Sequence, residues 1–353
     1  MGSSRQINIG GLKIGGNAPV RVESMLKTRL EDMDGCLEEL KCLKRSGCEL
    51  ARVAFPDESH IARFSRLIAA SEIPIMADIH FNHKFAIAAL DCGAESIRIN
   101  PGNMTDRAGL ESVLSSARAN GAAIRIGSNG GSLSGGQLAA SGGDRVTALV
   151  NAVAEQLGVL ADAGFDDIII SAKSSSVTET VRANFILSGR YDFPLHIGIT
   201  EAGPGIHGAV KSAAGLGILL AQGIGDTMRV SLTGDSKTEV DVAYTILRSL
   251  GLRERGMNLI SCPCCGRRRV DVGELVELAK GLLPDELPDG FTVAVMGCEV
   301  NGPREAAAAD IGIAGTSGGF VLFRRGKAVA SGGIDAMSSA FSSHLRQAID
   351  DFS

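Results

Sequence analysis

The amino-acid sequence predicts an α/β protein with an N-terminal (β/α)8 TIM barrel and a smaller C-terminal α+β domain. Eight short runs of β-forming residues alternate with helical patterns in the first 250 residues, which is typical of such a barrel. A second set of strands and helices follows Gly256. The 353 residues suffice for a large and a small domain, and we place the barrel at residues 1–254 and the second domain at 255–353.

The individual elements follow from hydrophobic periodicity and from turn-forming residues between the periodic segments. The predicted barrel strands are residues 20–24, 50–55, 73–79, 96–100, 123–127, 167–171, 195–200 and 228–232. The clearest connecting helices are residues 33–46, 59–70, 145–163 and 238–250. Six glycines in residues 130–143 predict a flexible loop over the barrel mouth. In the second domain we expect helices at 272–281, near 304–309 and at 335–350, and strands at 292–296, 311–314 and 320–324.

A TIM barrel carries its active site at the carboxyl ends of its strands, so residues there are candidates for binding and catalysis. Five of them are permanent cations, although the chain has a net charge of -5. Single arginines often form structural ion pairs, but five on one rim favour a polyanion such as a diphosphate. In chain order the candidates are Glu23, Ser24, Arg52, Asp78, His80, Arg98, Asn100, Arg125, Asn129, Lys173, Glu201, Arg229 and Ser231.

Two glycine-containing turns, residues 100–102 and 223–226, are expected to bring backbone amides to the same mouth. His80 follows a predicted strand, and a structural imidazole is the alternative to a functional one.

Two cysteine-containing blocks in the second domain predict a metal centre. The first, Ser-Cys-Pro-Cys-Cys-Gly-Arg at residues 261–267, has the Cys-x-x-Cys spacing with which two thiolates reach one metal. The second, at residues 296–306, supplies a third thiolate and a carboxylate seven residues later. This donor set favours a catalytic iron–sulfur cluster with one displaceable ligand, although the spacing alone fits structural zinc equally well. The candidate ligands are Cys262, Cys265, Cys298 and Glu305, with Cys264 as an alternative to Cys265.

Composition excludes several classes of protein. Hydrophobic residues make up 44% and charged residues 21%, as in globular proteins, and the negative net charge argues against nucleic acid as a partner. No apolar run reaches the length of a membrane span, and the first residues lack the core of a signal peptide. The eight cysteines do not form a disulfide framework. We therefore expect a cytoplasmic protein that binds neither nucleic acid nor membranes.

Four further motifs are Ala-Asp-Ile-His-Phe at 77–81, Arg-Ile-Asn-Pro-Gly-Asn at 98–103, Leu-His-Ile-Gly-Ile-Thr-Glu-Ala-Gly at 195–203 and Gly-Ile-Gly-Asp-Thr-Met-Arg-Val-Ser-Leu at 223–232. Together with the cysteine blocks, and in this order, they closely resemble the 4-hydroxy-3-methylbut-2-enyl diphosphate synthases of the methylerythritol phosphate pathway of isoprenoid biosynthesis. The resemblance covers nearly the whole chain, whose length is that of the two-domain bacterial form.

The resemblance implies reductive ring opening of 2-C-methyl-D-erythritol 2,4-cyclodiphosphate to 4-hydroxy-3-methylbut-2-enyl diphosphate, with one hydroxyl lost as water. Two electrons enter through a 4Fe–4S cluster held by Cys262, Cys265, Cys298 and Glu305, of which Glu305 yields its iron to substrate oxygen. Glu201 matches the carboxylate that handles protons near the reacting carbon. The positions that match diphosphate-binding or mouth residues are Arg52, Asp78, His80, Arg98, Asn100, Arg125, Asn129, Lys173, Arg229 and Ser231.

The resemblance also implies partners: flavodoxin or ferredoxin as electron donor, and a second copy of the chain. In such a homodimer the cluster domain of one subunit caps the barrel of the other, so the active site is shared.

The chain departs from the family pattern at several positions. Glu23 stands where glutamine is usual, and Arg304 replaces a glycine directly before Glu305. The Arg304 side chain restricts the backbone, and its charge is expected to lower the basicity of Glu305. One rival hypothesis is a different barrel reductase or a pterin-binding transferase with a cluster domain, although five cations are excessive for a pterin. The other is an iron–sulfur or zinc sensor on a barrel, which needs no proton donor such as Glu201.

Overall fold

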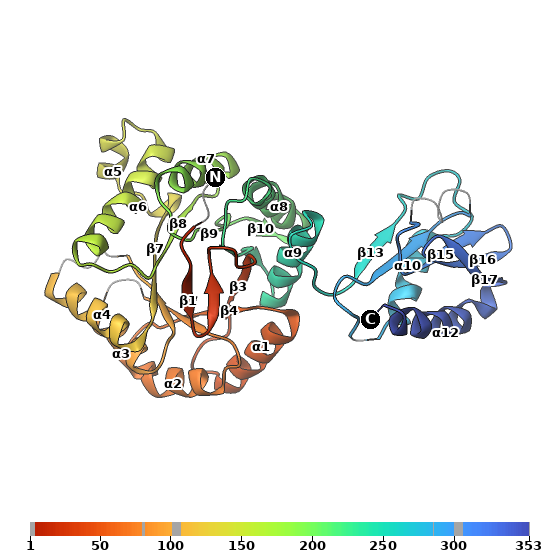
Figure 1. Ribbon diagram of the computed structural model, residues 1–353, viewed down its shortest axis with the longest axis horizontal. Helices are drawn as coiled ribbons and strands as arrows, with labels where there is room; N and C mark the ends of the chain where they lie inside the picture. Colours follow the sequence, from red (N-terminus) through yellow and green to blue (C-terminus); the bar gives the residue numbers. More distant parts are fainter. Residues whose placement is uncertain (1–3, 80–81, 101–106, 285, 300–305, 353) are drawn as a thin grey trace. The chain divides into compact units, whose positions relative to one another are not determined.

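The structure, a computed structural model, describes residues 4–79, 82–100, 107–284, 286–299 and 306–352. It divides into two compact units, Met1–Arg253 and Glu254–Ser353, each with its own hydrophobic core. The first unit is a parallel β/α barrel and the second a mixed sheet with helices, so the predicted fold class is confirmed (Figure 1). None of the helices in the described ranges combines the length and the apolar character that crossing a membrane requires.

Eight parallel strands form the barrel. A backbone bridge between Ile170 and Leu195 joins the first and last strands of the sheet and so completes the ring. Around the ring the order is β8 (Ile168–Lys173), β7 (Ala123–Asn129), β6 (Ser96–Arg98), β5 (Ile75–Asp78), β4 (Leu50–Ala54), β3 (Arg21–Met25), β11 (Thr227–Met228) and β9 (His196–Ile197). All eight predicted strands are present, with ends that differ by a few residues.

Helices surround this barrel (Figure 1). Several begin at an Asp, Asn or Ser whose side chain accepts a hydrogen bond from a free N–H of the first turn, as Asp235 does from Thr238 N. At the other end, α1 stops at Gly47, whose φ of 96° few other residues adopt. The helices are α1 (Met33–Ser46), α2 (Ile61–Ala70), α3 (His83–Asp91), α4 (Arg107–Asn120), α6 (Arg145–Asp162), α7 (Val177–Arg190), α8 (Gly205–Ala221) and α9 (Ser236–Ser249).

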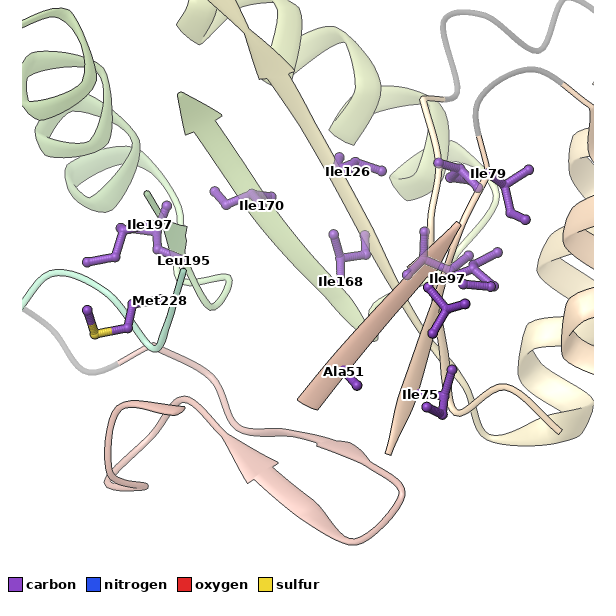
Figure 2. Packing of buried hydrophobic residues seen from close by; sticks show 14 of the residues in the cluster. Ala51, Ile75, Ile79, Ile97, Ile126, Ile168, Ile170, Leu195, Ile197 and Met228 are labelled. Atoms are coloured by element: carbon purple, nitrogen blue, oxygen red, sulfur yellow. The ribbon is translucent and has the colours of Figure 1, made fainter. Parts of the chain in front are cut away.

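Alternation along the strands separates an outer apolar layer from the barrel interior. On β4, Ala51 and Val53 join the core that packs against the helices, so Leu50 and Arg52 face inward. Figure 2 shows part of the outer layer, including Ile75, Ile97, Ile126 and Ile168 from four neighbouring strands.

The interior changes from apolar to polar along the barrel axis. Near the amino ends of the strands, Leu50, Met76, Ala123 and Ile169 form a second buried cluster. This cluster includes residues of a hairpin that the sequence analysis missed, with strands β1 (Ile7–Ile9) and β2 (Leu12–Ile14). Two residues further along the strands, the inward positions carry Arg52, Asp78, Arg125 and Ser171.

The second unit contains a five-stranded sheet in sequential order. Strands β13, β14 and β15 are parallel, and β16 and β17 continue antiparallel. Helices α10 (Val272–Gly281) and α12 (Met337–Asp350) contribute to its core, which contains Phe291, Phe320 and Phe341. The strands are β13 (Asn258–Ser261), β14 (Thr292–Met296), β15 (Ile311–Thr316), β16 (Gly319–Arg324) and β17 (Lys327–Gly332).

Three local predictions were wrong. The glycine-rich segment 130–143 is partly helical, with a 3-10 turn at Gly130–Ser132 and helix α5 (Gly135–Ala140). The helix expected near 304–309 is a turn in its described residues 306–308. Residues 223–226 precede β11 and lie at the amino end of the barrel, away from the mouth, where Asp226 accepts a hydrogen bond from Leu195 N at 2.7 Å.

Candidate active site

A cavity of about 680 Å³ opens at the carboxyl ends of β4 to β7. Its lining includes five predicted site residues, Arg52, Asp78, Arg98, Asn100 and Asn129. Residues of the partly helical segment 130–143 cover one side, where Ser134 and Gln137 form the capping box of α5. The cavity therefore combines charged strand ends with a polar wall, and its volume suits a small ligand.

Asp78 lies between two of the predicted cations. Its carboxylate oxygens are 3.7 Å from Arg52 Nε and 3.6 Å from Arg98 Nη1. Burial lowers the pKa of Arg98, repulsion from Arg52 adds to this, and attraction to Asp78 opposes it. Both guanidinium groups thus lie against the same carboxylate at the cavity wall.

Arg229 is oriented by Glu239, a buried carboxylate that the sequence analysis missed. Its Nε and Nη2 donate to the two oxygens of Glu239 at 3.2 and 3.3 Å. The same carboxylate also accepts hydrogen bonds from Leu232 N and Ser24 Oγ and pairs with Lys27 Nζ at 3.0 Å. The sequence did carry a signal for Glu239, since it is an acidic residue within the apolar stripe of α9. An acidic residue at such a position is rarely buried without a partner, so a buried ion pair could have been predicted there.

Arg125 and Glu23 form an ion pair inside the barrel, with only 2% and 1% of each residue exposed. Burial raises the pKa of Glu23, but the positive charges of Arg125, Arg52 and Lys173 outweigh it, so the pKa lies below its ordinary value. Burial lowers the pKa of Arg125 to about 10, a value at which it is still charged at neutral pH. The structure therefore places Arg125 beneath the mouth rather than on its surface.

Lys173 lies at the end of β8, with 8% of the residue exposed. Burial, together with repulsion from Arg125 and Arg52, holds its pKa well below the usual range. Gly198 leaves room for this side chain, since a Cβ there would lie 3.2 Å from Lys173 Nζ. Among the described residues, three buried carboxylates, Asp78, Glu23 and Glu239, pair with four of the five predicted cations, and Glu239 also pairs with Lys27.

The remaining predicted residues are less tightly held. Glu201 is exposed and has a φ of 51°, a left-handed conformation that costs a non-glycine residue about 1 kcal/mol or more. Asn129 is half-buried at the end of β7, and Ser231 is half-buried three residues after the end of β11. His80 and Glu305 lie outside the described residues.

The cysteines of the second unit lie at the carboxyl edge of its parallel strands. Cys262 follows β13 and Cys298 follows β14, and these strands are paired through Ser261 and Val295. Between them, Gly297 N donates a hydrogen bond to Cys262 Sγ at 3.1 Å. Cys298 is buried, whereas Cys265 is exposed.

The residues present fit a cluster in their donor chemistry. Thiolates are the soft ligands that iron–sulfur clusters require, and an N–H donated to a ligand sulfur is a usual way to tune them. Among the described residues, no three His, Cys, Asp or Glu side chains are already gathered around one point. Cys264 has a φ of 53° and an exposed side chain, and the structure gives it no role that Cys265 lacks.

Comparison with known proteins identifies the family of this chain. Residues 4–244 match the GcpE TIM-barrel domain, and residues 258–347 match the GcpE protein C-terminal domain. The 4-hydroxy-3-methylbut-2-en-1-yl diphosphate synthase (flavodoxin) of Maridesulfovibrio salexigens is 46% identical over 92% of this chain and 91% of its own length. The protein of the same name from Lawsonia intracellularis is 43% identical over 99% of this chain and 97% of its own.

Solved structures with a similar barrel are far more distant in sequence. Dihydropteroate synthase from Yersinia pestis aligns with a TM-score of 0.50 and 13% identity, over 70% of this chain and 98% of that one. At this identity the similarity shows the barrel fold alone. The two family matches and the relatives above 40% identity extend over nearly the whole chain, which belongs to the GcpE family of 4-hydroxy-3-methylbut-2-en-1-yl diphosphate synthases.

Proposed function

We propose that this chain reduces 2-C-methyl-D-erythritol 2,4-cyclodiphosphate to 4-hydroxy-3-methylbut-2-enyl diphosphate. The reaction consumes two electrons and two protons, opens the cyclic diphosphate and releases one hydroxyl as water. The observation that carries the proposal is the set of five cations that the strands bring to the mouth or just beneath it, two of which, Arg52 and Arg98, line a cavity of about 680 Å³ and lie against one carboxylate. A cyclic diphosphate would offer these cations the oxygens that guanidinium and ammonium groups bind.

The side chains of the mouth have separate tasks in this proposal. Arg52, Arg98, Lys173 and Arg229 bind the diphosphate oxygens, while Asp78 and Glu239 fix the arginines and so reduce the cost of ordering them on binding. Glu201, exposed in the turn that follows β9, is assigned to deliver a proton to the departing hydroxyl oxygen. The other residues assigned to the substrate are Asn100, Asn129, Ser231, His80 and, from beneath, Arg125.

The second unit is assigned to electron transfer. Cys262, Cys265, Cys298 and Glu305 would hold a 4Fe–4S cluster, which supplies the two electrons when it is bound. The names of the relatives specify flavodoxin, so we assign reduced flavodoxin as the donor to this chain. Comparing turnover with equal concentrations of reduced flavodoxin and reduced ferredoxin tests this, and a faster reaction with ferredoxin would reverse the assignment.

Electron paramagnetic resonance of anaerobically purified, dithionite-reduced protein tests the proposal as a whole. We expect a cluster signal that changes when the cyclodiphosphate is added. A signal that ignores the compound, or zinc in place of iron after reconstitution, would contradict it. The variant Glu201→Gln separates enzyme from sensor, because the enzyme should keep binding the cyclodiphosphate and lose turnover.

We further propose that the chain forms a homodimer with a shared active site. One supporting feature is the exposed apolar face of α8, where Ile206, Val210 and Ile218 are 74%, 62% and 48% exposed. Analytical ultracentrifugation should find a dimer for the wild type and a monomer for the double variant Ile206→Asp/Val210→Asp, with Val329→Asp as a control. In mixed dimers of Glu201→Gln and Cys298→Ser subunits, partial recovery of activity supports shared sites, and no recovery counts against them.

A further inference from the structure

Strand β7 carries Asn129 to the cavity, and it remains a strand beyond the point where its neighbour β6 ends. The two strands are paired up to Arg98 and Arg125, and Ile99 N still donates a hydrogen bond to Arg125 O at 3.0 Å. On its other side, β7 stays paired with β8 as far as Asn129 and Lys173. In the described part of the chain, the last residues of β7 therefore have a paired strand on one side only.

Gln156 of helix α6 occupies the place beside β7 that β6 leaves. If the parallel ladder continued, Gly127 N would donate to Ile99 O, because the hydrogen bonds of such a ladder are evenly spaced. Instead, Gly127 N donates to Gln156 Oε1 at 3.1 Å, and Gln156 Nε2 donates to Gly127 O at 3.4 Å. One side-chain amide thus bonds to both backbone groups of Gly127.

Replacing a strand in this way takes a side chain with both a donor and an acceptor. A carboxylate offers acceptors and an ammonium group offers donors, whereas the amide of glutamine offers both. Only 6% of Gln156 is exposed, so burying its amide is costly unless both of its ends are bonded. The two bonds to Gly127 meet this requirement, and Gln156 itself lies in the lining of the cavity.

A second side chain ties the same stretch of β7 to α6. Alternation along the strand places Ile126 in the helix-facing layer (Figure 2), so Asn129 faces the interior and Ser128 faces the helices. Ser128 Oγ donates a hydrogen bond to Leu149 O of α6 at 2.9 Å. The end of β7 is therefore held by β8 along one edge and by α6 along the other.

Asn129 is the site residue that this anchoring places. It lines the cavity together with Arg52, Arg98 and Asn100. Asn129 stands at the N-cap position of the 3-10 turn at 130–132, but its side chain makes no capping hydrogen bond there, as an asparagine at this position often does. Its place at the cavity therefore depends on the backbone of β7, which Gln156 holds two residues earlier.

We propose that Gln156 is a positioning residue, whose amide stands in for a strand beside Gly127 and so holds Asn129 at the cavity for the substrate. The contact of Asn129 with the substrate rests on the proposed function, whereas the anchoring of β7 by Gln156 does not. Gln156 thus acts on the ligand through Asn129, although it belongs to a helix outside the barrel.

Hydrogen–deuterium exchange of the full chain, read by mass spectrometry, tests the anchoring. Gln156→Met keeps the length of the side chain and removes both bonds to Gly127. We expect the slowest amides of the peptide that covers Ala123–Asn129 to exchange about tenfold faster, which corresponds to the loss of about one hydrogen bond. A peptide that covers β5 should keep its wild-type rate. Unchanged exchange at β7 would overturn the proposal, and so would an equal increase at β5, because Gln156 would then stabilise only the barrel as a whole.

Two further variants make the exchange experiment specific. Glu155→Met is the matched control, because Glu155 lines the same cavity from the neighbouring position of α6 and is exposed. It should leave the exchange of β7 unchanged, and a rise equal to that of Gln156→Met would overturn the proposal. If Gln156→Met does not fold, Gln156→Glu keeps an acceptor for Gly127 N, but its carboxylate cannot donate to Gly127 O. The exchange of β7 should then still rise, and exchange at the wild-type rate would overturn the proposal.

Calorimetry with the cyclodiphosphate tests the effect on the ligand. Asn129→Ala should weaken binding about tenfold, the loss expected for one hydrogen bond, and Gln156→Met should weaken it by no more than this. In the double variant, Gln156→Met should add no further loss, because it acts through Asn129. Additive losses would overturn the positioning role. If the wild type does not bind the cyclodiphosphate, the proposed function fails, and the exchange experiment still decides whether Gln156 anchors β7.

Discussion

Glu239 offers the sharpest test of how the mouth is built. Only 1% of this residue is exposed. Its carboxylate accepts hydrogen bonds from Nε and Nη2 of Arg229, the N–H of Leu232 and the hydroxyl of Ser24, and it forms an ion pair with Lys27. Glu239→Gln removes the negative charge and turns an amide NH2 toward donors. Breaking a buried pair from one side costs about 3–5 kcal/mol, and glutamine retains one acceptor, so we expect a loss of about 3 kcal/mol.

Urea-induced unfolding followed by tyrosine fluorescence measures this loss in the barrel alone. The chain has no tryptophan, and its two tyrosines, Tyr191 and Tyr244, both lie in the first unit. Asp241→Asn is the control on the same helix: Asp241 is 51% exposed and pairs with Lys237 at 2.6 Å, and such a pair is worth about 0.5 kcal/mol. A loss below about 1 kcal/mol for Glu239→Gln would refute the reasoning, because it would mean that the buried charge is not stabilised by these partners.

Three further predictions concern binding, pH and metal content. In calorimetry, Lys173→Met should weaken the binding of inorganic diphosphate about 10- to 100-fold. Lys173→Arg keeps the charge and should lose less affinity. Equal losses of affinity would show that the charge of Lys173 does not bind the ligand. A hydrogen bond to Glu31 raises the pKa of His60; burial opposes this shift, and Asp57 adds to it. Protonated His60 therefore stabilises the fold fully below its unfolded pKa near 6.5. This stabilisation is lost as the pH rises through the higher pKa of the folded state. Glu31 and Asp57 are more than half exposed, so solvent weakens both ion pairs. In thermal melts, His60→Gln should therefore lower the free energy of unfolding by less than about 1 kcal/mol at pH 5.5 and not at all at pH 8.5. An equal loss of stability at both pH values would contradict this. Cys265→Ser should lower the iron content of anaerobically reconstituted protein and Cys264→Ser should not, and the reverse order would exchange their roles.

The barrel was predictable because its strands obey simple rules. Apolar residues alternate between the helix-facing layer and the interior, and charged residues take the inward positions near the carboxyl ends of β4 and β5, as at Arg52 and Asp78. The bounds of α1, α10 and β14 agree with the prediction because caps or turns mark them clearly. By contrast, β17 was missed because it is an edge strand with an almost fully exposed, non-alternating pattern.

The charge pattern of the mouth was only half visible in the sequence. The five cations follow strands and can be read from them, but their partners Glu23 and Glu239 are identified only once the chain is folded. For the same reason Arg125 was placed on the rim, although the structure buries it beneath. Residues 223–226 were assigned to the mouth because of their glycines, but a turn that precedes a strand lies at the opposite end of the barrel from one that follows it.

Phosphorus NMR of a single-turnover reaction tests the central claim most directly. The anaerobically reconstituted full chain is mixed with the cyclodiphosphate and reduced flavodoxin, with Glu201→Gln as the parallel control. We predict that the two signals of the cyclic diphosphate are replaced by those of a linear diphosphate monoester in the wild type and persist in the variant. Persistence of the cyclic signals in the wild type, with the cluster intact and reduced, would contradict the account.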